Sequence, residues 1–321
     1  MTKRTVFDEH LTACRFEDAR DLLQAELASG RLLDPRLDPY WPRIADRLAG
    51  EIDKTFGTGE VVAFWESMRD FFTDKIEPVW GHAHKGSIYF RLGLASLPDD
   101  FVRGKRELEA AYQEDLALEK TGGGAPQAYG QPAYAALAIL ERIDDSEYVN
   151  LADKRRFTNQ LFHAFNAAIF GIAVQTDRVE IAIERISPPD GLLSCLAAYG
   201  ELREARKQRL SFATVSLTGT VVEALLLADL YHRKGIAKLP NGKDILNVEL
   251  GPLLEEAIRR SVFPTDSIRV AFQLVHIFCN RLHPGNEFRQ AYKLVPRVAW
   301  TVSVFFELAV LEWSKTFSPV P

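Results

Sequence analysis

The sequence predicts an all-α protein, and three observations support this prediction. Apolar residues recur at spacings of three and four along most of the 321 residues, as they do on one face of an α-helix. No convincing run of alternating apolar and polar residues is bounded by hairpin turns, which is the pattern of strands. Hydrophobic content of 47% and charged content of 26% are ordinary for a globular protein with an ample core.

The first predicted helices lie within residues 1–120. Residues 16–30 place apolar side chains on one stripe, and the pattern stops at Gly30. The next segments, "YWPRIADRLAGEIDKTFG" and "EVVAFWESMRDFFTDKI", have similar spacing. Residues 84–119 then predict a helix, a Pro-Asp-Asp turn and a second helix. We therefore expect region 1–120 to be built from helical hairpins.

The hairpin of residues 84–119 resembles a tetratricopeptide repeat. Small and large residues fall near the positions typical of that repeat, namely Tyr89, Leu92, Gly93, Gly104, Leu108 and Ala111. Small residues there let two helices pack closely, and large ones fill the space between them. The second helix is off the ideal register by about one residue. An ordinary helical hairpin therefore explains the pattern equally well, while the resemblance implies a region that binds a protein partner.

Two segments rich in Gly and Pro divide the rest of the chain. Residues 121–132, "TGGGAPQAYGQP", are expected to be a linker or surface loop, because they lack the strand and the Gly-Lys-Ser/Thr ending of a phosphate-binding P-loop. A second break, "SPPDG", precedes the C-terminal part. We assign residues 133–200 to connecting helices and residues 201–321 to a C-terminal helical bundle.

The C-terminal region begins with an apolar segment, residues 201–235, which we expect to form one long helix. Its middle, "SLTGTVVEALLLADL", contains a single carboxylate, Glu223. A carboxylate in apolar surroundings is costly unless it is paired. Glu223 therefore either faces solvent or an Arg, or belongs to a site. We also expect helix 201–235 to pack against helix 298–314.

Composition argues against several classes of function. The formal net charge of −5 indicates neither nucleic acid nor an anionic membrane as a partner of the whole chain. The three cysteines form no CxxC pair, and His82 and His84 would point to different faces of a helix. We therefore expect no metal and no cofactor.

The compartment is inferred from cysteine usage and apolar runs. Sparse cysteines fit a reducing compartment, and the start of the chain lacks an apolar run of signal-peptide length. The stretch "VAWTVSVFFELAVLEW" is interrupted by Glu307 and is too short to span a bilayer. These features predict a cytoplasmic protein without a membrane partner.

The C-terminal region also carries the most specific pattern. Residues 278–287, "FCNRLHPGNE", place Asn280 and His283 directly before a Pro-Gly helix break. Together with Gly219 and the "VEALLLADL" run upstream, this segment resembles the HEPN domain, a small helical domain of many RNA-cleaving and antiviral-defence proteins. The abortive-infection-like branch is the most similar. The resemblance covers about residues 201–316.

This resemblance implies a chemistry and an assembly. Active family members carry an Arg shortly before the His, often followed at once by a polar residue such as Asn; here Asn280 and His283 match, but Cys279 occupies the Arg position. The family implies metal-independent RNA cleavage, in which a His transfers the proton and a cation stabilises the negative charge that develops on the phosphate. It also implies a homodimer with His283 near the two-fold axis, for which helix 298–311 is a candidate surface. The candidate catalytic residues are His283, Asn280 and Glu223.

Basic residues near the motif are the candidate phosphate or RNA contacts. Arg289, Lys293 and Arg297 recur at a spacing of four and would form one basic stripe on a helix, with Arg281 close by. A second stripe is expected from Arg203, Arg206 and Arg209. These local patches would be hidden by the acidic total charge.

Three functions remain open from the sequence. We favour a catalytically weak or silent HEPN-like module that binds RNA or nucleotide and dimerises, fused to a helical protein-interaction region. The first alternative is a metal-independent HEPN ribonuclease of a defence or toxin system, which the Cys at position 279 disfavours. The second is a purely structural helical scaffold, which dimerisation through the His283 face would disfavour.

Overall fold

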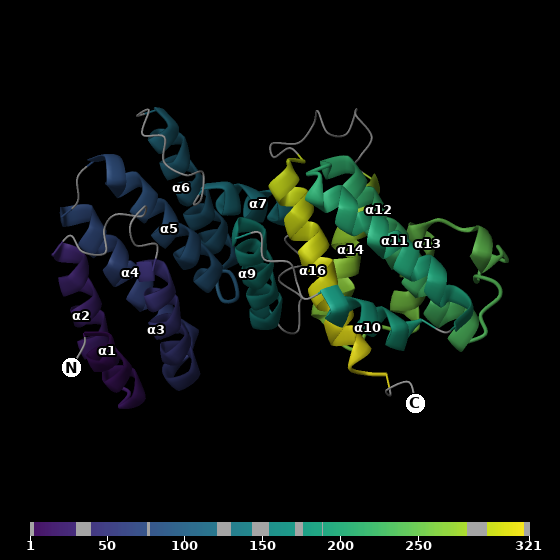
Figure 1. Cartoon of the computed structure of the whole chain (residues 1–321), viewed down its shortest axis with the longest axis horizontal. Helices are drawn as coiled ribbons and strands as arrows, with labels where there is room; N and C mark the ends of the chain where they lie inside the picture. The colour runs from purple at the N-terminus through teal and green to yellow at the C-terminus, as the bar shows by residue number, and fades with distance from the viewer. Residues whose placement is uncertain are drawn as a thin grey trace. The chain divides into compact units, whose positions relative to one another are not determined.

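The computed structural model describes residues 3–29, 40–75, 78–120, 130–142, 154–170, 176–187, 189–280 and 294–317. The all-α prediction is confirmed: these residues are overwhelmingly helical, and within them strand-like pairing is limited to one bridge between Lys238 and Asp244. Contacts divide the chain into two compact units, Met1–Ala133 (unit 1) and Tyr134–Pro321 (unit 2) (Figure 1).

Unit 1 is a succession of helices that each pack against the next in the sequence. The helices are α1 (Lys3–Thr12), α2 (Phe16–Ala28), α3 (Tyr40–Phe56), α4 (Thr58–Lys75), α5 (Pro78–Ser96) and α6 (Phe101–Lys120). Helix α2 also contacts α4, so the helices form layered hairpins. Buried side chains from α1 to α5, including Trp41, Met68 and Ile88, form one hydrophobic core. The expected helical hairpins are therefore present.

The α5–α6 hairpin shows the close approach predicted from its small residues. A Cβ on Gly93 would lie 3.0 Å from the carbonyl oxygen of Gly104, and a Cβ on Gly104 would lie 2.9 Å from the Cα of Leu97. No side chain fits between the helices at these positions. The Asp100 carboxylate accepts a hydrogen bond of 2.9 Å from the backbone N–H of Arg103, which caps the start of α6.

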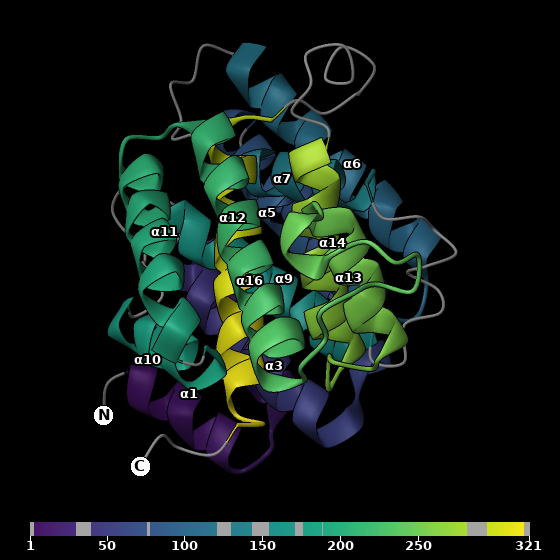
Figure 2. The ribbon, with the colours of Figure 1, turned by 90° about the vertical axis from the view of Figure 1, so that its right-hand side faces the viewer.

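Unit 2 is a helical bundle around α16. Its helices are α7 (Gly130–Leu140, which begins just before the unit boundary), α9 (Lys154–Phe170), α10 (Thr176–Ile186), α11 (Pro189–Lys207), α12 (Ser211–Leu227), α13 (Leu250–Arg259), α14 (Asp266–Asn280) and α16 (Pro296–Ser314). Helix α16 contacts α9, α10, α12 and α14 (Figure 2). The expected packing between α12 and α16 is confirmed.

Part of the predicted 121–132 loop is helical. Helix α7 begins at Gly130, so residues 130–132 belong to a helix, and residues 121–129 lie outside the described residues. The predicted connecting helices after residue 133 belong to the same compact unit as the C-terminal bundle.

The prediction of one long helix over residues 201–235 is wrong. Helix α11 ends at Lys207 and α12 begins at Ser211. Between them Arg209 adopts a left-handed backbone with φ of +58°, and the N–H of Leu210 donates to the carbonyl of Ala205 at 3.0 Å. This is a left-handed helix end, a conformation usually adopted by Gly. After α12 the chain continues as a π-helix, η1 (Ala228–Arg233).

The continuous helix Ser211–Arg233, formed by α12 and η1, is long and apolar enough to cross a membrane by length and composition alone. The apolar stretch singled out from the sequence was a different one, around Glu307. In the structure α12 contacts α11, α13, α14 and α16, and its buried side chains include Val215, Val222 and Leu226. Much of its apolar surface is therefore used inside the bundle.

The apolar surface of α16 is likewise used within unit 2. Val298, Val302, Phe305 and Phe306 are each at most 1% exposed, and so are most of their apolar neighbours on this helix. These side chains are covered by the other helices of the same chain. The expectation that helix 298–311 supplies apolar surface to a dimer is therefore wrong.

Candidate functional site

The motif resembling HEPN lies where α14 ends, at Asn280. Cys279, Asn280 and Glu223 belong to the described residues. The remaining predicted residues of the motif and its basic stripe, His283, Arg281, Arg289 and Lys293, lie outside them. The described residues therefore show how α12, α13 and α14 pack around the first part of the motif, which ends at Asn280.

Cys279 is packed into the contact between α12 and α14. Its thiol donates to the carbonyl of Val215 at 3.3 Å, and a Cβ on Gly219 would lie 2.5 Å from its Sγ. Only glycine leaves room for the sulfur at position 219. Gly219 and Cys279, which the sequence linked through the family resemblance, are thus direct neighbours. The residue that occupies the expected Arg position is therefore part of a helix–helix contact.

The Cys279 thiol is neutral at physiological pH. Burial raises its pKa to about 12, and the negative charge of Glu223 acts in the same direction, although a hydrogen bond from the Gly219 backbone opposes them. A thiol with this pKa carries no charge near neutrality. Cys279 therefore supplies neither a cation for a phosphate group nor a reactive thiolate.

Asn280 contacts a histidine that the sequence analysis did not select. The Asn280 side-chain amide lies 2.9 Å from His276 Nε2, one helical turn back on α14. The His276 ring also packs on α13, because a Cβ on Gly251 would lie 2.9 Å from its Cε1. Burial lowers the pKa of His276, while Glu255 and Glu249 oppose this effect. The spacing of four residues between His276 and Asn280 was the signal that could have identified this pair.

Glu223 is half-buried on α12, on the side of the motif. Burial is the main cause of its raised pKa, and the nearby charge of Glu249 raises the pKa further. Glu223 also influences Cys279, and Glu249 and Glu255 influence His276. The charged side chains that act on Cys279 and His276 are thus carboxylates. Such surroundings disfavour a phosphate group at this side of the motif.

The predicted stripe of Arg203, Arg206 and Arg209 does not form a phosphate-binding surface. Arg206 is buried and pairs with Glu307 on α16 at 2.9 Å, and Tyr199 also donates to this carboxylate at 2.9 Å. Arg203 pairs with Glu180 at 2.9 Å, and Arg209 lies beyond the end of α11. A spacing of three would align the three Arg side chains only on one uninterrupted helix. Helix α11 ends at Lys207, before Arg209.

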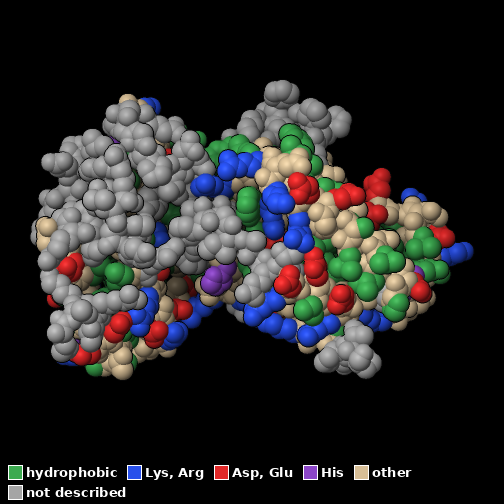
Figure 3. Space-filling model, in the orientation of Figure 1, with side chains coloured by type: hydrophobic (Ala, Val, Ile, Leu, Met, Phe, Trp, Pro, Cys, Tyr) green, Lys and Arg blue, Asp and Glu red, His purple; other side chains and the backbone are tan. Residues whose placement is uncertain are grey.

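Arg297, the last residue of the first stripe, lies in the first turn of α16 and is partly exposed. On the face drawn in Figure 3, Lys and Arg side chains of unit 2 are interspersed with Asp and Glu. Among the side chains coloured on this face, both signs of charge are present.

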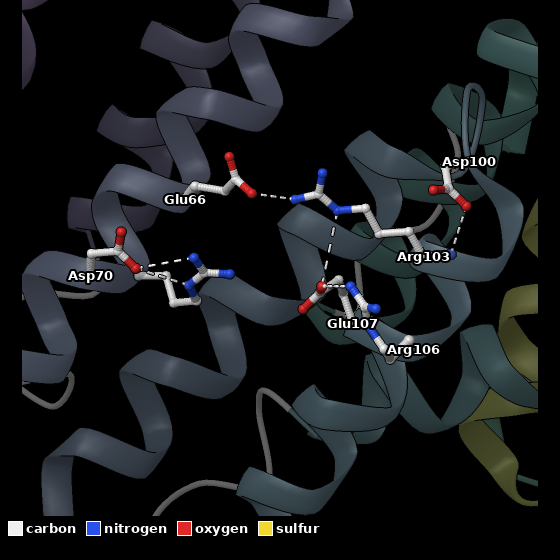
Figure 4. A network of polar contacts seen from close by, with 7 residues as sticks. Glu66, Asp70, Asp100, Arg103, Arg106 and Glu107 are labelled. Carbon is white, nitrogen blue, oxygen red and sulfur yellow. Dashed lines mark hydrogen bonds and ion pairs between the residues drawn. The ribbon is translucent and has the colours of Figure 1, made fainter.

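A second polar cluster lies in unit 1, on α4 and α6 (Figure 4). Arg103 of α6 pairs with Glu66 of α4, and the buried carboxylate of Glu107 pairs with Arg106 at 3.0 Å. On α4, Arg69 pairs with Asp70 at 3.1 Å. The Arg103–Glu66 pair links two helices that are separated in sequence by α5, whereas the other two pairs lie within one helix each. The cluster is thus held together by ion pairs within α4, within α6 and between them.

The two histidines of the His-Ala-His pair have separate environments. His84 is fully buried and accepts a hydrogen bond of 3.1 Å from the Trp41 indole N–H, whereas His82 contacts Glu114 of α6 at 2.5 Å. Among the described residues, no group of three or more His, Cys, Asp or Glu side chains is arranged to hold a metal ion.

The described geometry defines an all-α protein with a layered helical unit and a bundle whose motif residues lie at the α12–α14 contact. Comparisons with protein-family models, curated proteins and solved structures find no match to this chain. The functional interpretation therefore depends on the residues themselves, above all on Gly219, Cys279 and Asn280.

Proposed function

We propose that this chain is a catalytically silent HEPN-like module that binds RNA or nucleotide and pairs with a second copy, joined to a helical region that binds a protein partner. The observation that supports the lack of catalytic activity is that the side chain of Cys279 is uncharged and packed. Its neutral thiol is packed on Gly219 at the position where the family has an Arg.

The absence of a cation at position 279 weakens cleavage for an electrostatic reason. In metal-free cleavage, negative charge develops on the phosphate and must be stabilised by a donor that is already in place. Removing one such donor typically costs on the order of 100- to 1000-fold in rate. His276 is a poor substitute, because burial lowers its pKa and favours the neutral ring. The nearby Glu223, Glu249 and Glu255 add negative charge instead of positive charge.

The binding part of the proposal is supported by the basic residues that the sequence places after the motif. Arg281, Arg289, Lys293 and Arg297 follow within 19 residues of Cys279. Lys and Arg contacts to phosphate supply most of the affinity of sequence-independent nucleic-acid binding. RNA binding without cleavage is therefore the expected activity, and the layered hairpins of unit 1 are the expected site for a protein partner.

The direct test incubates the pure full-length protein with mixed RNA, with and without a chelator, beside a His283→Ala variant. We expect RNA to be retained in a salt-dependent manner and to remain intact. Brisk cleavage in chelator that His283→Ala abolishes would instead establish the ribonuclease alternative. A chain that neither retains RNA nor forms a dimer would establish the structural scaffold.

A Cys279→Arg variant tests the reason for silence. An Arg at position 279 must give up the buried place that the sulfur occupies beside Gly219. We expect Cys279→Arg to raise metal-free cleavage, and an added His283→Ala to abolish the gain. Cys279→Gln is the matched control, because it adds length without positive charge. Equal cleavage by the Arg and Gln variants would contradict the electrostatic explanation.

A further inference from the structure

A cavity of about 490 Å³ lies at the start of α14 in unit 2. It is lined by the end of α13, the segment between α13 and α14, the first turn of α14 and Arg156 in the first turn of α9. The motif lies at the other end of α14, which has 15 residues. At a rise of about 1.5 Å per residue, the two ends are ~20 Å apart. The cavity is therefore separate from the site described above.

One positive side chain of the cavity, Arg156, is anchored by a carboxylate behind it. Glu312 of α16 accepts from Arg156 Nε at 3.1 Å, and its side chain is only 11% exposed. The same carboxylate accepts from Gln160 at 2.6 Å and from the Thr265 hydroxyl at 2.8 Å. These contacts join α9, α16 and the start of α14, so the position of Arg156 is set by three parts of the bundle.

The second positive side chain, Arg269, is held on α14 itself. Its guanidinium donates to Gln273 at 2.6 Å and to Asp266 at 3.3 Å. Arg156 and Arg269 both line the cavity, together with one carboxylate, Asp266. The lining therefore carries two guanidinium groups and one carboxylate, and each guanidinium is paired with a carboxylate, Arg156 with Glu312 and Arg269 with Asp266. A guanidinium fixed by its neighbours loses little freedom when it binds a further anion.

The cavity also has an apolar wall. Phe263 lines it and packs against Phe272 and Trp313, with ring centroids 5.2 and 5.9 Å away. These contacts hold the ring in place while leaving it partly exposed. Ile258 and Pro264 extend the same wall. The cavity thus combines two positive groups with a flat apolar surface.

We propose that this cavity binds a small phosphate monoester that carries an apolar ring. The planar guanidinium groups of Arg156 and Arg269 match phosphate oxygens, and the Phe263 wall matches the ring. A volume of about 490 Å³ is in the range of small-molecule sites. This inference is independent of the proposed function, because it uses none of the motif residues.

The binding test titrates the full-length protein with phenyl phosphate by isothermal titration calorimetry. Phenol and inorganic phosphate, titrated separately, distinguish the contributions of the ring and the anion. We expect phenyl phosphate to bind saturably and at least tenfold more tightly than either. No saturable binding at millimolar phenyl phosphate would overturn the proposal. Equally tight binding of inorganic phosphate would overturn the part played by the ring.

Variants locate the binding in this cavity. We expect Arg156→Gln and Arg269→Gln each to weaken phenyl phosphate binding at least tenfold. Arg155→Gln is the matched control, because Arg155 is an exposed neighbour on α9 that does not line the cavity. Unchanged binding in both cavity variants, or an equal loss in the control, would overturn the proposal.

Ser261→Asp tests the cavity without removing an anchored side chain. Ser261 lines the cavity, is exposed and has a left-handed φ of +51°, a conformation that Asp tolerates. The added negative charge should weaken phenyl phosphate binding at least tenfold while circular dichroism and the melting temperature stay close to those of the unmodified protein. A folded Ser261→Asp variant that binds with unchanged affinity would contradict the site even if the Arg variants failed to fold.

Discussion

At the scale of single residues, the contact between Gly219 and Cys279 determines what the motif can do. The sulfur is within 2.5 Å of the place that a Cβ on residue 219 would take. Burial keeps the thiol neutral, since its pKa is about 12. One contact therefore accounts for the glycine on α12 and leaves an uncharged side chain where the proposed HEPN-like motif would have an Arg. The same contact sets the distances on which the predicted effect of Gly219→Ala depends.

We predict that Gly219→Ala lowers the free energy of unfolding by ~1–3 kcal/mol, because overpacking a close helix contact costs this much. Adding Cys279→Ala should restore most of the loss, since the new Cβ would lie 3.7 Å from the Cβ of residue 279. Gly200→Ala is the control: Gly200 is exposed on α11 with nothing within 4 Å of an added Cβ, and the change should stabilise by roughly 0.5–1 kcal/mol. Urea unfolding of the three variants and the unmodified protein measures these effects, and a Gly219→Ala protein as stable as the control would refute the packing argument.

The spacing of charged residues in the sequence could not predict which of them are exposed at a site. Arg206 was assigned to an exposed stripe, yet it is buried against Glu307, 101 residues later in the chain. Such a pairing depends on how α11 meets α16, which a periodic pattern does not contain. Of the motif residues, Cys279 packs against Gly219 of α12, whereas the exposed Asn280 contacts His276 on its own helix. Whether they bind RNA stays a prediction.

At the scale of elements, helix ends marked by turn residues or glycines in the sequence were predicted, and helix ends without them were missed. The α5–α6 hairpin was predicted because Pro98, Asp99 and Asp100 mark its turn and glycines mark its contact. The end of α11 was missed because an Arg, not a Gly, adopts the left-handed conformation. Three helices end in this way without glycine, with positive φ at Cys14, Arg209 and Ser261. Tertiary packing must offset the local strain at each of them.

We predict that Arg209→Gly stabilises the protein by ~0.5–1 kcal/mol. A left-handed backbone costs a residue with a Cβ about 1–2 kcal/mol, and the larger freedom of Gly in the unfolded chain offsets part of the gain. Lys207→Gly is the control, because Lys207 lies in the last turn of α11, where glycine should destabilise by up to ~1 kcal/mol. Thermal and urea unfolding measure both changes. A loss of stability in Arg209→Gly would show that its side chain contributes more than its backbone strain costs.

At the scale of the whole molecule, the predicted homodimer requires a surface other than α16. The apolar side chains of that helix are already covered within the chain. Among the exposed large apolar residues, three lie at the starts of two helices of unit 2: Leu210 (48% exposed) and Phe212 (50%) flank the start of α12, and Val295 (36%) precedes α16. Figures 1 and 2 both show α12 and α16 beginning at the end of unit 2 where α14 finishes. These residues therefore share the end that carries the motif.

We predict that the full-length chain is a dimer by size-exclusion chromatography with light scattering, and that Leu210→Asp with Phe212→Asp converts it to a monomer. Asp at these positions places a carboxylate at the cap and first turn of α12, where it favours the helix, so the fold should be kept. Leu193→Asp is the control, because Leu193 is 81% exposed on α11 and does not lie at this end. It should leave the dimer intact. A monomer mass for the unmodified chain at every accessible concentration would contradict pairing, and a dimer that survives the double substitution would place its interface elsewhere.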